Sequence, residues 1–204
     1  MMRRLLPYFF VMFVWMPACF ASLADDPEIA DGYLTNGEYV SMGVVENNEK
    51  LFITGGGAET IDVRDYGYLE VQDTARPLGY HSGIYDIFLY DNSKLLYLGG
   101  VTEEITLSYA STAELRGGTI SGITLGRRPQ DSCYVTIFCQ EGYQKTTTGI
   151  SGLWADETAF NIQFINVGSP YPPTANYVFV ETIPEPATLL LLGLGGLWLR
   201  RRKR

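Results

Sequence analysis

The chain offers few residues that could carry out catalysis. His81 is the single histidine among the 204 residues, and Ser82 follows it directly. A serine nucleophile needs its histidine base and an oxyanion site held by a rigid frame. Neighbouring residues in a loop that contains Pro77 and Gly79 cannot face each other in that way. We therefore expect no catalytic residues and interpret the chain as a non-enzymatic protein.

Zinc would also find too few ligands. Besides the histidine, the chain downstream of its first 24 residues has only Cys133 and Cys139, and these residues are not closely spaced. They stand at the two ends of a run that alternates like a strand, which spans about 20 Å, whereas a disulfide needs Cα atoms within about 7 Å. The two cysteines can pair only if the chain turns between them, and two buried free thiols are the equal alternative.

The chain has more candidate ligands for calcium than for zinc, because it is rich in carboxylates. No calcium-binding loop of alternating aspartates is present, however, and no glycine-rich nonapeptide array. We therefore predict no metal and no cofactor, and interpret the acidic residues as solvated faces. Five acidic residues could cluster on neighbouring strands: Asp62, Asp65, Asp73, Glu103 and Glu104.

Four tyrosines are candidate residues for binding a sugar ligand. Tyr66, Tyr68, Tyr85 and Tyr90 could present an aromatic face and a polar edge to the sugar rings of a polysaccharide. Aromatic residues are common on strand surfaces, so ordinary surface tyrosines are the simpler interpretation. Polysaccharide binding or degradation is therefore kept as the alternative function.

The segment that carries most of these side chains contains an internal sequence repeat. Copies start at residues 43, 61, 87 and 105, with a fifth at 123, so the steps are 18, 26, 18 and 18 residues. In the copies that start at 61, 87 and 105, and more faintly in the first, a triplet with apolar ends recurs eight residues later, as in Ile61-Asp62-Val63 and Leu69-Glu70-Val71. Three copies then close with a pair of glycines, which suits a sharp corner. The glycine pairs are Gly55-Gly56, Gly99-Gly100 and Gly117-Gly118.

Such constant spacing predicts stacked coils, because unrelated turns would scatter the offsets. We predict an all-β fold, a small right-handed parallel β-helix over residues 25–132, with an antiparallel β-sandwich as the alternative. The extra residues 74–83 of the longest step are expected to form a loop. Residues 133–182 are expected to form a β cap with strands at 133–139, 160–167 and 177–183, and with Trp154 in its core.

The amino-terminal end has the features of a secretion signal. Arg3 and Arg4 precede an apolar stretch over residues 5–16, and small residues follow at positions 18, 21 and 24. We predict a signal peptide over residues 1–24, with cleavage after Ala21 or Ala24. An uncleaved anchor is the alternative, but the apolar stretch is shorter than the roughly 20 residues of a spanning helix.

The net charge of -8 conceals a more acidic body. Seven of the 15 basic residues lie at the two ends, and the remaining 8 against 23 acidic residues give -15. Such a body repels phosphate backbones, so we expect no nucleic-acid partner.

The carboxy-terminal end combines three features in order. Pro184, Glu185 and Pro186 precede a short apolar stretch, residues 187–199, which we expect to form a hydrophobic helix. Five basic residues follow it and would hold this end on the cytoplasmic side of a membrane. They are Arg200, Arg201, Arg202, Lys203 and Arg204.

This end, residues 183–204, resembles the sorting and anchor segment of the PEP-CTERM proteins of Gram-negative bacteria. The resemblance implies that an exosortase reads Pro184-Glu185-Pro186, cuts near it, and hands the body to the cell surface or to an exopolysaccharide matrix. We therefore predict an exported structural or adhesive surface protein. Its expected partners are the secretion machinery, the exosortase, the membrane before processing, and an exopolysaccharide.

Overall fold

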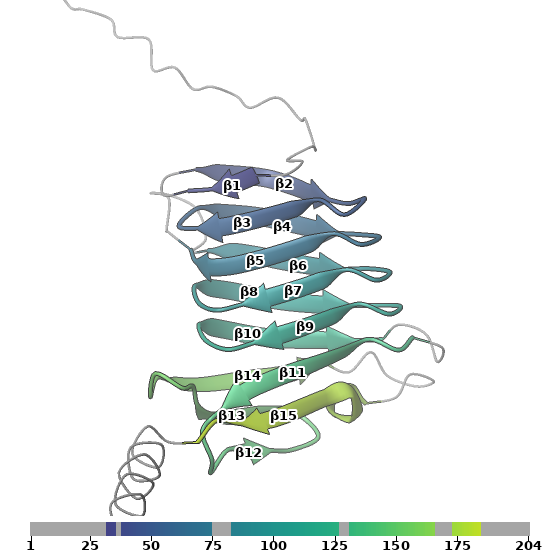
Figure 1. The fold of residues 1–204 in the computed structure, drawn as a ribbon. Helices are drawn as coiled ribbons and strands as arrows, with labels where there is room; N and C mark the ends of the chain where they lie inside the picture. Colours follow the sequence, from purple (N-terminus) through teal and green to yellow (C-terminus); the bar gives the residue numbers. More distant parts are fainter. Residues whose placement is uncertain (1–31, 36–37, 75–82, 127–130, 166–172, 185–204) are drawn as a thin grey trace, which may run out of the picture.

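The computed structural model describes residues 32–35, 38–74, 83–126, 131–165 and 173–184. Over these residues the chain is all-β, apart from one 3-10 turn, η1 (Thr174–Tyr177). Its strands form two sheets that lie face to face (Figure 1). Within the same ranges, no helix is long and apolar enough to span a membrane.

Up to β11, successive strands alternate between the two sheets, so that each strand pairs with the strand two places further along the chain. The seven-stranded sheet contains, in spatial order, β1 (Gly32–Leu34), β3 (Lys50–Thr54), β5 (Tyr68–Asp73), β7 (Lys94–Tyr97), β9 (Thr112–Leu115), β11 (Tyr134–Cys139) and β15 (Val178–Thr182). The eight-stranded sheet contains, from the carboxy-terminal end, β12 (Gln144–Lys145), β13 (Gly149–Leu153), β14 (Ala159–Ile165), β10 (Thr119–Leu125), β8 (Val101–Leu107), β6 (Ile84–Leu89), β4 (Gly57–Val63) and β2 (Tyr39–Val45).

The repeat found in the sequence matches the strand register residue by residue. The starts of the five copies are direct partners across the eight-stranded sheet, and the second triplets are partners across the other sheet. These pairings are parallel, so the predicted repeat is confirmed and the antiparallel alternative is wrong for these strands. The two rows are Gly43, Ile61, Ile87, Ile105 and Ile123, and Leu51, Leu69, Leu95 and Ala113. Val135 continues the second row but follows Ile123 by 12 residues, so the fifth copy does not keep the offset of eight.

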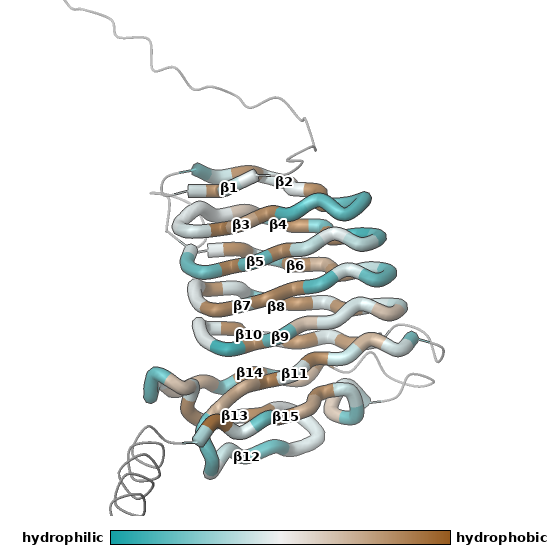
Figure 2. Tube along the Cα trace, in the orientation of Figure 1, coloured by the Kyte–Doolittle hydropathy of each residue, from teal (hydrophilic) through white to brown (hydrophobic). Residues whose placement is uncertain are grey.

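Both rows point into the space between the sheets, where they form one apolar core. Ile61, Ile87 and Ile105 are completely buried, and so are Leu51 and Leu69. The apolar segments recur at the same place in successive coils, as Figure 2 shows. Because burying one such side chain contributes about 1.5–3 kcal/mol, a row of equivalent residues holds adjacent coils in register.

The turns that follow β2, β4, β6 and β8 share one unusual backbone conformation. Asn47, Asp65, Asp91 and Tyr109 all have positive φ, between 51° and 62°. Each lies four residues after the start of its copy. Asn and Asp tolerate this left-handed conformation better than other residues with a side chain, which explains three of the four positions.

The glycine pairs form the opposite corner, where adjacent coils come closest. A Cβ at Gly117 would overlap the carbonyl oxygen of Leu98 on the preceding coil. Gly118 has a φ of +82°. The pair therefore meets two separate demands, close backbone approach at the first position and a left-handed conformation at the second.

Parallel pairing extends beyond residue 132, where the cap was expected to begin. Strand β11 pairs with β9 and β15, and β14 pairs with β10, all in parallel. Among the described strands, antiparallel pairing is limited to β12 with β13 and β13 with β14, and this hairpin covers the outer edge of β14. At the same end the Lys145 ammonium donates a hydrogen bond to the carbonyl oxygen of Val178, at 2.5 Å.

Trp154 belongs to the core of this last part, as predicted. Its side chain is completely buried. Its indole Nε1 donates a hydrogen bond to the carbonyl oxygen of Gly118, at 2.9 Å, and its ring lies 4.2 Å from that of Phe160. Trp154 thus connects the last coils to the corner formed by Gly117 and Gly118.

Several predicted segments lie outside the described residues. These are the signal peptide over residues 1–24, most of the loop over 74–83 with His81 and Ser82, and the hydrophobic helix over 187–199.

The glycine corner gives a test of the stacking geometry. We expect Gly117→Ala to lower the free energy of unfolding by about 3 kcal/mol or more, because two coils must move apart to admit the methyl group. Gly126→Ala is the matched control, since nothing lies within 4 Å of a Cβ there although φ is +66°. It should cost only about 1–2 kcal/mol. Equal losses in urea unfolding would contradict a steric role for Gly117.

Candidate functional site

The predicted sorting motif begins where the last strand ends. Strand β15 finishes at Thr182, and the backbone N–H of Ile183 donates a hydrogen bond to the carbonyl oxygen of Cys139, at 2.9 Å. Pro184 follows and is exposed. Glu185, Pro186 and the basic residues 200–204 lie outside the described residues. The motif therefore follows directly after the hydrogen-bonded body.

The five acidic residues that were considered for a calcium cluster do not come together. No group of three or more metal-ligating side chains occurs in the part of the chain that the structure describes. Asp62 is buried and forms a 2.5 Å ion pair with Arg64. Asp65 occupies a turn, and Asp73 ends β5 in the other sheet.

One of these residues, Glu104, belongs with Asp86 to an acidic row on the outer face of the eight-stranded sheet. Asp86 and Glu104 are direct partners in β6 and β8, and Glu59 and Glu103 lie near enough to act on Asp86. Partial burial, and then the three neighbouring carboxylates, raises the pKa of Asp86. Glu104 is itself held by the hydroxyls of Thr106 and Thr124, at 3.2 and 2.6 Å.

The raised pKa has a defined effect on stability. The folded protein holds the Asp86 proton more tightly than the unfolded chain, so stability falls as pH rises through the pKa of the unfolded and then of the folded state. We expect Asp86→Asn to raise the melting temperature at pH 7 by about 1–2 °C. The gain should disappear below about pH 3, which thermal melts followed by circular dichroism can measure. A gain that is the same at both pH values would exclude this charge effect.

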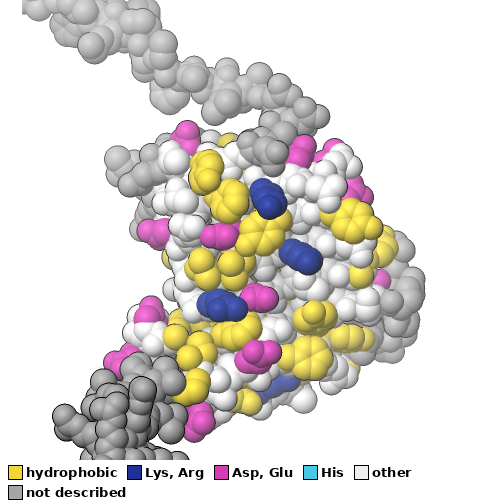
Figure 3. All heavy atoms as spheres, viewed as in Figure 1, with side chains coloured by type: hydrophobic (Ala, Val, Ile, Leu, Met, Phe, Trp, Pro, Cys, Tyr) yellow, Lys and Arg dark blue, Asp and Glu magenta, His cyan; other side chains and the backbone are white. Residues whose placement is uncertain are grey.

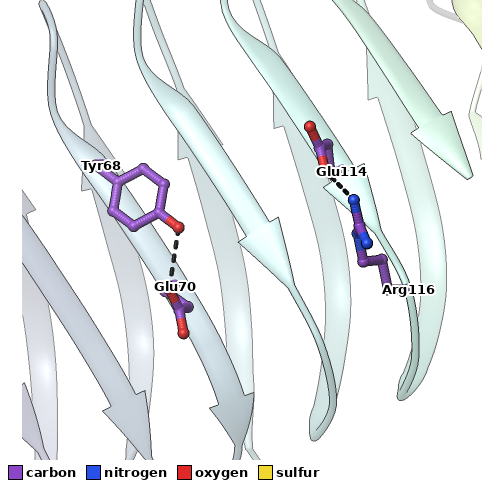
Figure 4. Close-up of polar contacts among 4 residues, drawn as sticks. All are labelled: Tyr68, Glu70, Glu114 and Arg116. Carbon is purple, nitrogen blue, oxygen red and sulfur yellow. Dashed lines mark hydrogen bonds and ion pairs between the residues drawn. The ribbon is translucent and has the colours of Figure 1, made fainter.

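The four tyrosines considered for sugar binding do not share a face. Tyr66 lies in the turn after β4, and Tyr85 lies on β6 of the eight-stranded sheet. Tyr68 lies on β5 of the other sheet, where its hydroxyl donates a hydrogen bond to Glu70, at 3.0 Å (Figure 4). Burial and this bond raise the pKa of Tyr68 to about 12. These tyrosines do not make one binding platform.

The outer face of the seven-stranded sheet carries a larger set of aromatic side chains, which includes Tyr68 and which we call the aromatic face. Rings of neighbouring strands touch at both ends of this face. Tyr33 stacks on Phe52 with ring centroids 5.2 Å apart, and Tyr134 meets Phe179 edge to face at 5.9 Å. Figure 3 shows apolar patches on this side, separated by single charged side chains. The members are Tyr33, Phe52, Tyr68, Tyr134, Phe138 and Phe179.

A shallow groove crosses the aromatic face over β9, β11 and β15, with a volume of about 520 Å³. Near it the guanidinium of Arg116 lies over the ring of Phe138, 4.2 Å from the centroid. Glu114 holds the same guanidinium in a 2.9 Å ion pair (Figure 4). Sequence reasoning missed this groove, because its residues come from three strands that are far apart in the chain.

A second hollow, of about 530 Å³, lies over the hairpin and β14 and has a more polar lining. Thr146, Thr148, Asn161 and Gln163 line it. No aromatic ring is exposed there to stack on a ligand, among the described residues that line it. We therefore regard the groove on the aromatic face as the better candidate site.

Both cysteines of the body are buried and free. They lie beside and at the end of the extended strand β11, and the thiol of Cys133 contacts the carbonyl oxygen of Leu107 at 3.6 Å. Burial raises the pKa of both thiols, so that little thiolate is present near neutral pH. Of the two alternatives in the sequence, the structure has the free thiols.

Alkylation can test this arrangement. At pH 8, iodoacetamide should label the folded exported protein at least about tenfold more slowly than the unfolded protein, since buried thiols are inert. Intact mass spectrometry after unfolding should then show two labels. A mass lower by two hydrogen atoms, with no label added, would show a disulfide instead.

The comparisons with known proteins concern the carboxy-terminal end alone. Residues 182–204 match the family model of the PEP-CTERM protein-sorting motif. The motif implies an exported protein, anchored transiently in a membrane and then processed by an exosortase. This confirms the resemblance seen in the sequence. No curated protein and no solved structure matches the chain.

Proposed function

We propose that this chain is a non-enzymatic structural protein of the bacterial cell surface or extracellular matrix, built as a right-handed parallel β-helix and delivered by exosortase processing. The observation that carries the proposal is the position of the sorting motif. It follows the last hydrogen bond of the body, from Ile183 to Cys139, so a cut next to it releases the body intact.

The architecture suits such a role. One parallel sheet and one mixed, mostly parallel sheet share an apolar core and form a rod-like body, because each coil is held by the coils on either side of it. Rigid stacked sheets present long side-chain rows to the outside, which supports the adhesive part of the proposal. The strong negative charge of the body keeps it soluble once it leaves the membrane.

The mass of the mature carboxy terminus tests the proposal. In a host that has an exosortase, we expect the surface fraction to contain protein that ends close to Glu185, without the five basic residues. Replacing Pro184, Glu185 and Pro186 together by alanine should leave residues up to Arg204 attached and keep the protein in the membrane fraction.

The matched control is Pro173→Ala, which removes an exposed proline ahead of η1 and leaves the motif intact. This variant should be processed like the parent. Recovery of uncut parent protein from the cytoplasm would overturn the proposal.

A further inference from the structure

The groove on the aromatic face combines exposed rings with hydrogen-bonding groups. Its volume of about 520 Å³ falls within the usual range of ligand sites, about 300–1,000 Å³. The residues used in the argument come from three neighbouring strands: Glu114, Tyr134, Thr136, Phe138, Phe179 and Glu181.

Two of these rings are unusually exposed for aromatic side chains. Tyr134 is 42% exposed and Phe179 is 55% exposed, and they lie on the adjacent strands β11 and β15. Strands in a sheet are about 4.8 Å apart, which is close to the length of one sugar in an extended glycan. The planes of the two rings are nearly perpendicular, at 81°, so one sugar can stack on the face of one ring while the next sugar contacts the other ring.

The polar groups of the groove match hydroxyl-rich ligands. Thr136 can donate and accept hydrogen bonds, and the carboxylates of Glu114 and Glu181 accept them. Figure 3 shows charged side chains among the apolar patches of this face, whereas a lipid surface or a subunit core favours a continuous apolar surface.

Charge narrows the class of ligand further. The groove has two carboxylates, and Arg116, the cation beside it, is already paired with Glu114. The body that surrounds it is strongly acidic. An anionic polysaccharide would be repelled, while an uncharged one would not.

We propose that this groove binds a neutral polysaccharide, with the glycan running across β9, β11 and β15 and its sugars in contact with the rings of Tyr134 and Phe179. This rests on the proposed function, because the ligand would be a component of the extracellular matrix. Beside the groove, the Arg116 side chain contacts both the ring of Phe138 and the carboxylate of Glu114.

Affinity electrophoresis can test the proposal with the full chain, purified in a mild detergent. The gels contain neutral polymers of glucose, N-acetylglucosamine, mannose or galactose, and alginate serves as the anionic comparison. We expect at least one neutral polymer to retard the protein and alginate to have no effect. Tyr134→Ala and Phe179→Ala should each weaken the retardation about tenfold, through loss of one stacking surface.

Two controls separate binding from folding. Tyr66→Ala removes a ring that is 62% exposed outside the groove, and it should leave retardation unchanged. Phe179→Tyr keeps the ring and should also retain binding. All variants should melt within about 2 °C of the parent, since Tyr134 and Phe179 are largely outside the core.

Any other result of the affinity electrophoresis would overturn the proposal. Examples are no retardation by any neutral polymer, retardation by alginate alone, or equal retardation of the parent and both alanine variants. Binding only to lipid vesicles or to a second copy of the chain would assign the face to those partners instead. Failure here leaves the mass of the carboxy terminus unaffected, so the two proposals fail separately.

Discussion

Parallel pairing of equivalent strands is the constraint on which the rest of this structure depends. Because each strand lies about 4.8 Å from the next, a side chain meets the same position of the coil above and below it. The interior rows must therefore repeat one type of residue, as Ile61, Ile87 and Ile105 do. The corners must repeat as well, which fixes Gly117 where another coil comes close.

The outer faces are free of this constraint and have diverged. On the eight-stranded sheet, Asp86 and Glu104 form part of an acidic row. The seven-stranded sheet carries the aromatic face, and Phe179 of this face lies on the strand that leads into the sorting motif. A uniform interior thus supports two surfaces of different chemistry, and the groove lies at the end of the body where the tail is attached.

Much of the fold could be predicted because the repeat shows as a regular spacing of apolar triplets and glycine pairs along the sequence. The register follows from offsets of 18 and 26 residues, and Trp154 could be assigned to the core from its type and position. The parallel pairing of β14 with β10 could not be predicted, because the hairpin of β12 and β13 separates these strands in the chain.

The groove escaped prediction for a related reason. Tyr134 and Phe179 are 45 positions apart in the chain and become neighbours only through the pairing of β11 with β15. The four tyrosines chosen from the sequence are closer to one another, yet strands and turns direct them to different sides of the molecule. Positions on a face depend on the register, which composition does not reveal.

The hairpin of β12 and β13, which includes Lys145, closes one end of the stack. The number of coils in the stack is therefore independent of the elements that close it. Inserting another 18-residue unit above the hairpin would add one strand to each sheet and leave the closing elements unchanged. Descendants of this chain can therefore become longer or shorter in whole units during evolution, and the distance between the sorting tail and the opposite end would change by one strand spacing each time.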